Sequence, residues 1–187
     1  MIGAALTTIE AMPVAAAAAT AFDRAAFEAR IRAPFRHRQA FAAPRVANGA
    51  VLGFMLNSLN AYEYGFGEGP GTLHAAGVFY SIGVTMAMDD EAWNTFHLND
   101  LTVRSGDAVP AHAGDGNPFG GRFVELQQRN ASFFVCSNAL RDLAGRAGTT
   151  IDVLITHLLP GMMLVPAGVA AINALQEERF TLFQTTS

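Results

Sequence analysis

The sequence contains a single cysteine, Cys136, among its 187 residues. One cysteine excludes an internal disulfide and any zinc site built from several cysteines, and it gives no information on the redox compartment. Charged residues are also scarce, at 15% of the chain, whereas the residue types AVILMFWYC make up 51%. This composition is typical of a globular chain rather than a disordered one. It leaves few charged residues for the surface of a monomer, which is a first indication that the protein is an oligomer.

No apolar run approaches the about 18–20 residues that a membrane-spanning helix needs, so no membrane span is predicted. The net charge of −4 provides no basic surface for nucleic acid, and we expect no nucleic-acid partner. The length suits one domain with some additional chain.

Residues 1–20 are rich in alanine and have two interpretations. They resemble the apolar part and the Ala-x-Ala cleavage region of an export signal, although no basic residues precede the run and Glu10 interrupts it. The alternative is an ordinary Ala-rich helix of the mature protein. Export to the periplasm is preferred here over a cytoplasmic location.

The rest of the chain alternates between helical and strand patterns. Helices are predicted over residues 21–32, 50–63, 122–129, 138–147, 150–158 and 167–178, with a short helix opening at Asp89. Strands are predicted over residues 37–42, 73–86, 132–136, 162–165 and 180–183. Residues 99–121, which are rich in Gly, Pro, Asp and Asn, are predicted to form a long loop. Strands that alternate with helices imply a parallel sheet covered on both faces.

Two features of the sequence could indicate a bound cofactor, but neither matches a known cofactor-binding motif. In the glycine-rich segment 65–71, Pro70 takes the place of the third glycine of G-x-G-x-x-G, and the segment follows a predicted helix rather than a strand. The histidines form neither H-x-x-x-H nor H-E-x-x-H, so isolated structural roles are favoured over a metal or haem site. They are His37, His74, His97, His112 and His157. We therefore expect no cofactor.

Other polar residues offer weaker signals. Asp89, Asp90 and Glu91 could supply an acid–base pair, but acids in a first helical turn face the positive end of the helix dipole, and this interpretation is favoured. Asn57 and Asn60 lie three residues apart on one side of their predicted helix. The sequence leaves open whether they point into a site or into solvent.

Cys136 ends the predicted strand SFFVC and precedes the predicted helix SNALRDLAGRA. In an open parallel sheet, ligands bind beyond the carboxyl ends of the strands, near the point where strand order reverses. A thiol there faces the amides of the first helical turn, which favour thiolate over thiol, and Ser137 or Asn138 can cap the same turn. The alternative is a buried cysteine that acts only as a small apolar residue. The residues by themselves leave both interpretations open.

Two segments resemble the C-terminal half of the DsrE/DsrF-like sulfur-relay family: FFVCSNAL at 133–140 and LLPGMMLVPAGVAAINALQEERFTLF at 158–183. The likeness extends over about residues 38–184. It implies a three-layer α/β/α flavodoxin-like fold with a mostly parallel five-stranded sheet, assembled as homo-oligomers (trimers or hexamers). It also implies a sulfur carrier or sulfurtransferase, in which the catalytic Cys136 holds sulfur as a persulfide.

The resemblance extends to the surroundings of the cysteine. Asn138, Pro166 and Gly168 match the family pattern and are expected to shape a pocket, whereas the alternative for Pro166 and Gly168 is that they only start a helix. With no second cysteine, the sulfur donor and acceptor must be a partner protein or a small thiol. The implied organisation is an Ala-rich segment (1–20), an N-terminal helix (21–36) and a DsrE-like domain (37–187) with an insertion at 99–121. A non-catalytic small-ligand binder and an oligomeric scaffold are the alternative functions.

Overall fold

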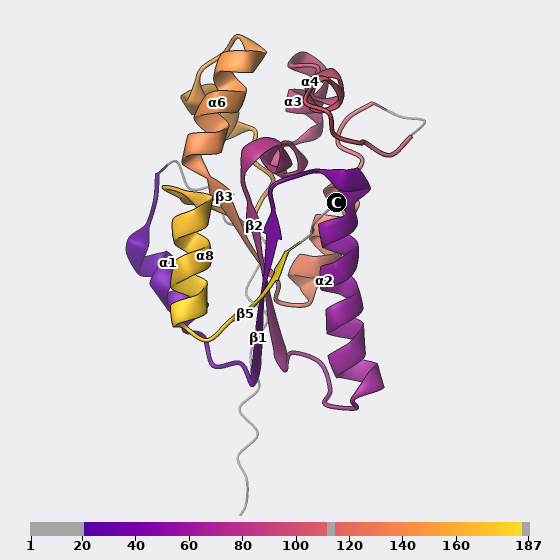
Figure 1. Ribbon diagram of the computed structural model, residues 1–187, viewed down its shortest axis with the longest axis vertical. Helices are drawn as coiled ribbons and strands as arrows, with labels where there is room; N and C mark the ends of the chain where they lie inside the picture. Colours follow the sequence, from indigo (N-terminus) through magenta and orange to yellow (C-terminus); the bar gives the residue numbers. More distant parts are fainter. Residues whose placement is uncertain (1–20, 112–114, 185–187) are drawn as a thin grey trace, which may run out of the picture.

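The structure is a computed structural model that describes residues 21–111 and 115–184. In these residues, five strands form one sheet in the order β4-β3-β2-β1-β5, and every neighbouring pair is parallel (Figure 1). The strands are β1 (His37–Ala43), β2 (Leu73–Phe79), β3 (Ser132–Cys136), β4 (Met162–Val165) and β5 (Thr181–Gln184). The central strands β2 and β3 are buried along their whole length because helices cover both faces. The predicted α/β fold is therefore confirmed.

The helices form a layer on each side of the sheet (Figure 1). α1 (Arg24–Ile31) and α8 (Gly168–Glu177) cover one face, and α2 (Ala50–Asn60) and α5 (Gly120–Gln128) cover the other. Beyond the carboxyl ends of the strands lie α3 (Asp90–Thr95), α4 (Leu98–Arg104) and α6 (Ser137–Ala147), and α7 (Ile151–Thr156) packs against α6.

Side-chain alternation along the strands divides the interior into two cores. Phe134 and Val165 point into the core beneath α1 and α8, whereas Phe133 and Val135 point into the larger core beneath α2 and α5. α6 and α7 contribute to the larger core and α8 to the smaller one. The chain therefore leaves β3 towards one face of the sheet and leaves β4 towards the other.

Two predicted elements differ in extent from the observed ones. The strand predicted over 73–86 ends at Phe79, and Ser81–Ala87 form a 3-10 helix, η3. A Cβ on Gly83 would lie 2.1 Å from the carbonyl oxygen of Ala43, so η3 crosses directly over the end of β1. Because residues 82–87 are all buried, their apolar pattern could not distinguish a strand from this helix.

Residues 99–121 are not a continuous loop. α4 occupies Leu98–Arg104, and α5 begins at Gly120. Leu98 and Thr102, four residues apart, are buried on one face of α4, and the Thr102 hydroxyl donates to the Leu98 carbonyl at 2.7 Å. The predicted helix over 50–63 ends as α2 at Asn60 and continues as a π-helical turn, Ala61–Gly65.

The Ala-rich segment 1–20 and His112 lie outside the described residues, so the predictions made for them stay predictions. Among the described residues, no helix combines the length and the apolar character needed to cross a bilayer.

Candidate functional site

Cys136 is the last residue of β3, and its side chain caps α6. The Sγ atom accepts a hydrogen bond from the Ala139 N–H at 3.4 Å. The backbone of Cys136 is extended, as is typical of an N-cap. The thiol thus lies against the first turn of an 11-residue helix, whose amides stabilise negative charge.

This junction lies where the chain reverses its course across the sheet. Cys136 pairs with Val165, the last residue of β4. After these two residues, α6 packs into one core and α8 into the other. Neighbouring strands whose connections diverge in this way leave a crevice at their carboxyl ends, and open α/β sheets bind ligands in such a crevice.

The thiol is nearly closed to solvent, since Cys136 is 5% exposed. By strand alternation, its side chain leaves the sheet on the same face as Phe134. The ring of Phe27, from α1, covers Phe134 edge-on with 5.0 Å between ring centroids. A reagent therefore needs some movement of the surrounding side chains before it can contact the sulfur fully.

An apolar groove of about 360 Å³ lies between α1 and α8 on this same face. Val165 forms part of its floor, and Pro166 lines the groove directly beyond the end of β4. Because neighbouring strands are about 4.8 Å apart, the groove comes within one strand of Cys136. Its apolar lining consists of Phe22, Phe27, Ile31, Val165, Pro166, Ala170, Ala171 and Ala174.

Charged side chains rim the groove and pair with one another. Glu28 forms ion pairs with Arg24 at 2.7 Å and with Arg32 at 3.1 Å, and Arg32 also forms an ion pair with Glu178 at 2.7 Å. The hydrogen bond to Glu178 is the main cause that raises the pKa of Arg32 above its usual value. Glu177 accepts a hydrogen bond from the Asn173 amide at 2.7 Å. Each of these charges thus has a partner of its own.

Gly168 and Tyr80 complete the surroundings of the junction. A Cβ on Gly168 would lie 2.7 Å from the Cβ of Tyr80, so only glycine allows α8 to begin against this tyrosine. Burial raises the pKa of Tyr80. Sequence reasoning missed Tyr80 because the predicted strand ran on to residue 86, whereas β2 ends at Phe79 and places Tyr80 at the carboxyl end of the sheet, as Cys136 is.

The other predicted site residues are dispersed. Ser137, the first residue of α6, is half-buried, whereas Asn138 is exposed and accepts a hydrogen bond from Arg141 at 3.1 Å. Asn57 and Asn60 belong to α2, on the opposite face of the sheet from the groove. Asn57 is exposed, and Asn60 accepts from Arg129 at 2.6 Å. The structure therefore brings Pro166 and Gly168 near Cys136 but does not bring the two α2 asparagines there.

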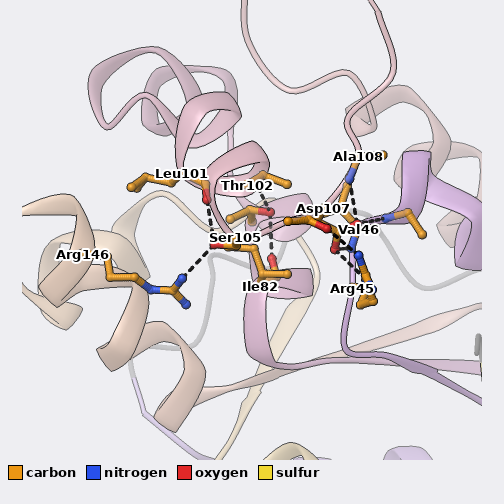
Figure 2. Close-up of polar contacts among 12 residues, drawn as sticks. Arg45, Val46, Ile82, Leu101, Thr102, Ser105, Asp107, Ala108 and Arg146 are labelled. Carbon is orange, nitrogen blue, oxygen red and sulfur yellow. Dashed lines mark hydrogen bonds and ion pairs between the residues drawn. The ribbon is translucent and has the colours of Figure 1, made fainter. Parts of the chain in front are cut away.

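A buried carboxylate holds the turn after β1, and no sequence signal pointed to it. Asp107 accepts from the backbone amides of Val46 at 2.7 Å, Ala47 at 2.9 Å and Ala108 at 2.8 Å (Figure 2). Burial opposes its charge, but these hydrogen bonds and Arg45 at 3.5 Å outweigh burial and lower the pKa of Asp107. The segment around Asp107 also contacts α6, because Arg146 donates to Ser105 at 2.9 Å (Figure 2).

A second buried polar cluster lies at the amino ends of β2 and β3. His74 is fully buried, and its Nε2 lies 2.6 Å from the Ser132 hydroxyl oxygen. Arg30 of α1 donates to the same oxygen at 2.5 Å, while the Nδ1 of His74 has no hydrogen-bond partner among the described residues. Burial, and then the charges of Arg30 and Arg38, lower the pKa of His74 to about 3. This cluster is at the opposite end of the strands from Cys136.

Three of the remaining candidates for acid–base or metal chemistry, Asp89, His157 and His37, have polar partners. Asp89 caps α3 by accepting from the Ala92 amide at 2.8 Å, which confirms the helix-start interpretation. Its carboxylate also lies 3.1 Å from His157, and His37 lies 2.6 Å from Glu68. Within residues 21–111 and 115–184, no three His, Cys, Asp or Glu side chains are grouped so as to hold a metal ion.

No protein-family model matches the chain, and no curated protein matches it. Among solved structures, the chain is similar to MTH1491 from Methanobacterium thermoautotrophicum, a protein of unknown function. That likeness has a TM-score of 0.52 and 21% sequence identity, and it covers 80% of this chain and 99% of MTH1491. At this identity the likeness supports the three-layer α/β/α fold and carries no activity with it.

Proposed function

We propose that the protein is a sulfur carrier that holds sulfane sulfur as a persulfide on Cys136. The observation that carries this proposal is the position of Sγ, which caps α6 at the carboxyl ends of β3 and β4 and accepts a hydrogen bond from the Ala139 N–H at 3.4 Å. The resemblance of residues 133–140 and 158–183 to the DsrE/DsrF-like family supports the same chemistry. It also supports a trimer or hexamer as the working assembly.

The transfer step needs no oxidant or reductant. The Cys136 thiolate attacks the outer sulfur of a donor persulfide, R–S–SH, while the donor's S–S bond breaks and R–S⁻ leaves. The product is Cys136–S–SH. An acceptor thiolate then attacks the outer sulfur in the same way, which regenerates the Cys136 thiolate. Because the chain has no second cysteine, the acceptor belongs to another molecule.

Intact mass after incubation with polysulfide tests the proposal. We expect a gain of one sulfur atom that a thiol reductant removes, and no gain in Cys136→Ser. Since Cys136 is the single cysteine, any thiol-linked gain belongs to it. If native protein is alkylated by iodoacetamide at Cys136 but gains no sulfur, the thiol is accessible and the proposal is wrong.

The low exposure of Cys136 favours a second candidate, a non-catalytic binder of small ligands at the α1/α8 groove. In that case Cys136 is a packing residue that is alkylated only after denaturation. Cys136→Ser would then bind the same ligands as the wild-type protein.

A further inference from the structure

The groove between α1 and α8 indicates what kind of sulfur compound this site takes. We infer that the groove seats the apolar body of a small, uncharged organic persulfide or thiol, which places its sulfur beside Cys136. This inference rests on the proposed function, and it adds the class of substrate.

One end of the groove is spanned by an ion pair, and the other end approaches the thiol. Arg32 and Glu178, the residues that follow α1 and α8, are joined at 2.7 Å and bridge the two helices. At the other end of α8, Pro166 lines the groove two residues before the helix begins, next to Val165. Val165 is the register partner of Cys136. A ligand that lies along the groove therefore has one end beside the β3–α6 junction.

The lining selects for apolar, uncharged compounds. Alanine, phenylalanine, isoleucine, valine and proline side chains form the interior of the groove. Four rim charges, on Arg24, Glu28, Arg32 and Glu178, form one continuous chain of ion pairs, and the fifth, Glu177, accepts a hydrogen bond from the neutral Asn173 amide. The rim therefore disfavours an anionic ligand most, whereas an apolar ligand disturbs none of these contacts. The volume of about 360 Å³ is that of a small-molecule site.

Methanethiosulfonate reagents test this inference without any sulfur transfer. Each reagent transfers its alkylthio group to the Cys136 thiolate to give a mixed disulfide, and methanesulfinate leaves. Each methylene buried in an apolar site raises affinity about four-fold. We therefore expect the hexyl reagent to modify Cys136 at least roughly ten times faster than the methyl reagent, with the anionic sulfonatoethyl reagent slowest.

Substitutions on α8 provide matched variants. Ala170 is exposed and lines the groove, so Ala170→Trp fills the groove without disturbing the core. Val169 is 66% exposed and is not among the lining residues, so Val169→Trp is the control on the same helix. We expect Ala170→Trp to lower the hexyl-to-methyl ratio roughly ten-fold and Val169→Trp to leave it unchanged. Ala174→Leu, a smaller change in the groove, should lower the ratio in the same direction.

The inference is overturned if the hexyl and methyl rates are equal in the wild type. It is also overturned if Val169→Trp and Ala170→Trp have the same effect on the ratio. Failure of the proposed function is a separate result, because inorganic polysulfide does not need the groove. Persulfide formation with an unselective groove would reject only the substrate class, whereas a selective groove without persulfide formation would reject only sulfur transfer.

Discussion

Acid should destabilise this protein through His74, well above the pH at which carboxylates titrate. Its imidazole is fully buried between the rings of Phe35, at 4.5 Å, and Phe180, at 5.1 Å. The nearest charged groups, Arg30 from α1 and Arg38 from β1, are both positive. Nothing in this cluster compensates a proton on the ring, so the folded protein keeps His74 neutral.

The size of the effect follows from the two pKa values. An unfolded histidine has a pKa of about 6.5, and burial with the two arginines lowers the pKa of His74 to about 3 in the folded protein. Above pH 6.5 both states are neutral and His74 makes no difference. Between pH 6.5 and 3 only the unfolded chain takes up the proton, so the free energy of unfolding falls by about 1.4 kcal/mol for each unit by which the pH is lowered. The loss is about 2 kcal/mol at pH 5.

Urea denaturation at pH 7.5 and pH 5, on wild type and on His74→Gln, measures this loss. Glutamine does not titrate and keeps a polar group within reach of the Ser132 hydroxyl. The other histidines are common to both proteins and cancel in the comparison. We expect the wild type to lose about 2 kcal/mol more than His74→Gln between the two pH values. Equal losses in the two proteins, or an NMR titration of His74 near pH 6.5, would refute the reasoning.

Three further predictions concern stability and are read from urea midpoints. Asp107→Ala leaves buried amides without an acceptor and should lower the free energy of unfolding by roughly 2–4 kcal/mol. Added formate should partly restore this loss. An unchanged free energy of unfolding would contradict the role of the carboxylate in holding the turn after β1. Gly168→Ala places a Cβ against Tyr80 and should cost about 1–3 kcal/mol. Its control, Gly145→Ala in the open part of α6, should stabilise by roughly 0.5–1 kcal/mol, so equal effects of the two changes would reject the clash. Trp93→Phe removes the hydrogen bond of 2.9 Å from the indole N–H to a buried carbonyl and should lower the free energy of unfolding by about 1–2 kcal/mol. No change in stability would mean that water replaces the indole as donor.

Much of the sheet could be predicted because its strands are short apolar runs between clear helix signals. β3 was predicted over its observed residues, and β1 and β5 to within a residue at each end. η3 was mistaken for strand because it is buried on every side, and α4 was hidden by its polar composition. The feature that bends η3 away, the close approach of Gly83 to Ala43, joins positions 40 residues apart.

In the candidate site, too, local features could be predicted from the sequence and contacts between distant residues could not. Cys136 could be placed because strand end, helix start and sulfur are all local features of the sequence. Asp107 contacts residues about 60 positions away, and Arg30 contacts Ser132 across 102 positions. Partners this far apart in the sequence are set by how the helices pack on the sheet, and no spacing rule within one segment can supply that information.

The two ends of the sheet are coupled through α1. This helix has eight residues, too few to be stable alone, so its place depends on what holds it. Phe27 and Ile31 bury its apolar side, and Arg30 ties it to Ser132 and to the carbonyls of Asn130 and Ala131. The same helix forms one wall of the groove. Loosening the polar cluster should therefore loosen the groove before the sheet unfolds.

Arg30→Ala tests this coupling. The substitution leaves every groove-lining side chain in place but removes the attachment of α1 to the amino end of β3. We expect the hexyl-to-methyl rate ratio at Cys136 to fall several-fold while the far-UV spectrum stays native. Arg122→Ala is the control, because the exposed ion pair of Arg122 with Glu125 at 2.8 Å lies on α5, on the opposite face of the sheet from the groove. If both variants keep the wild-type ratio, α1 is held by its apolar packing, and the two ends of the sheet act independently.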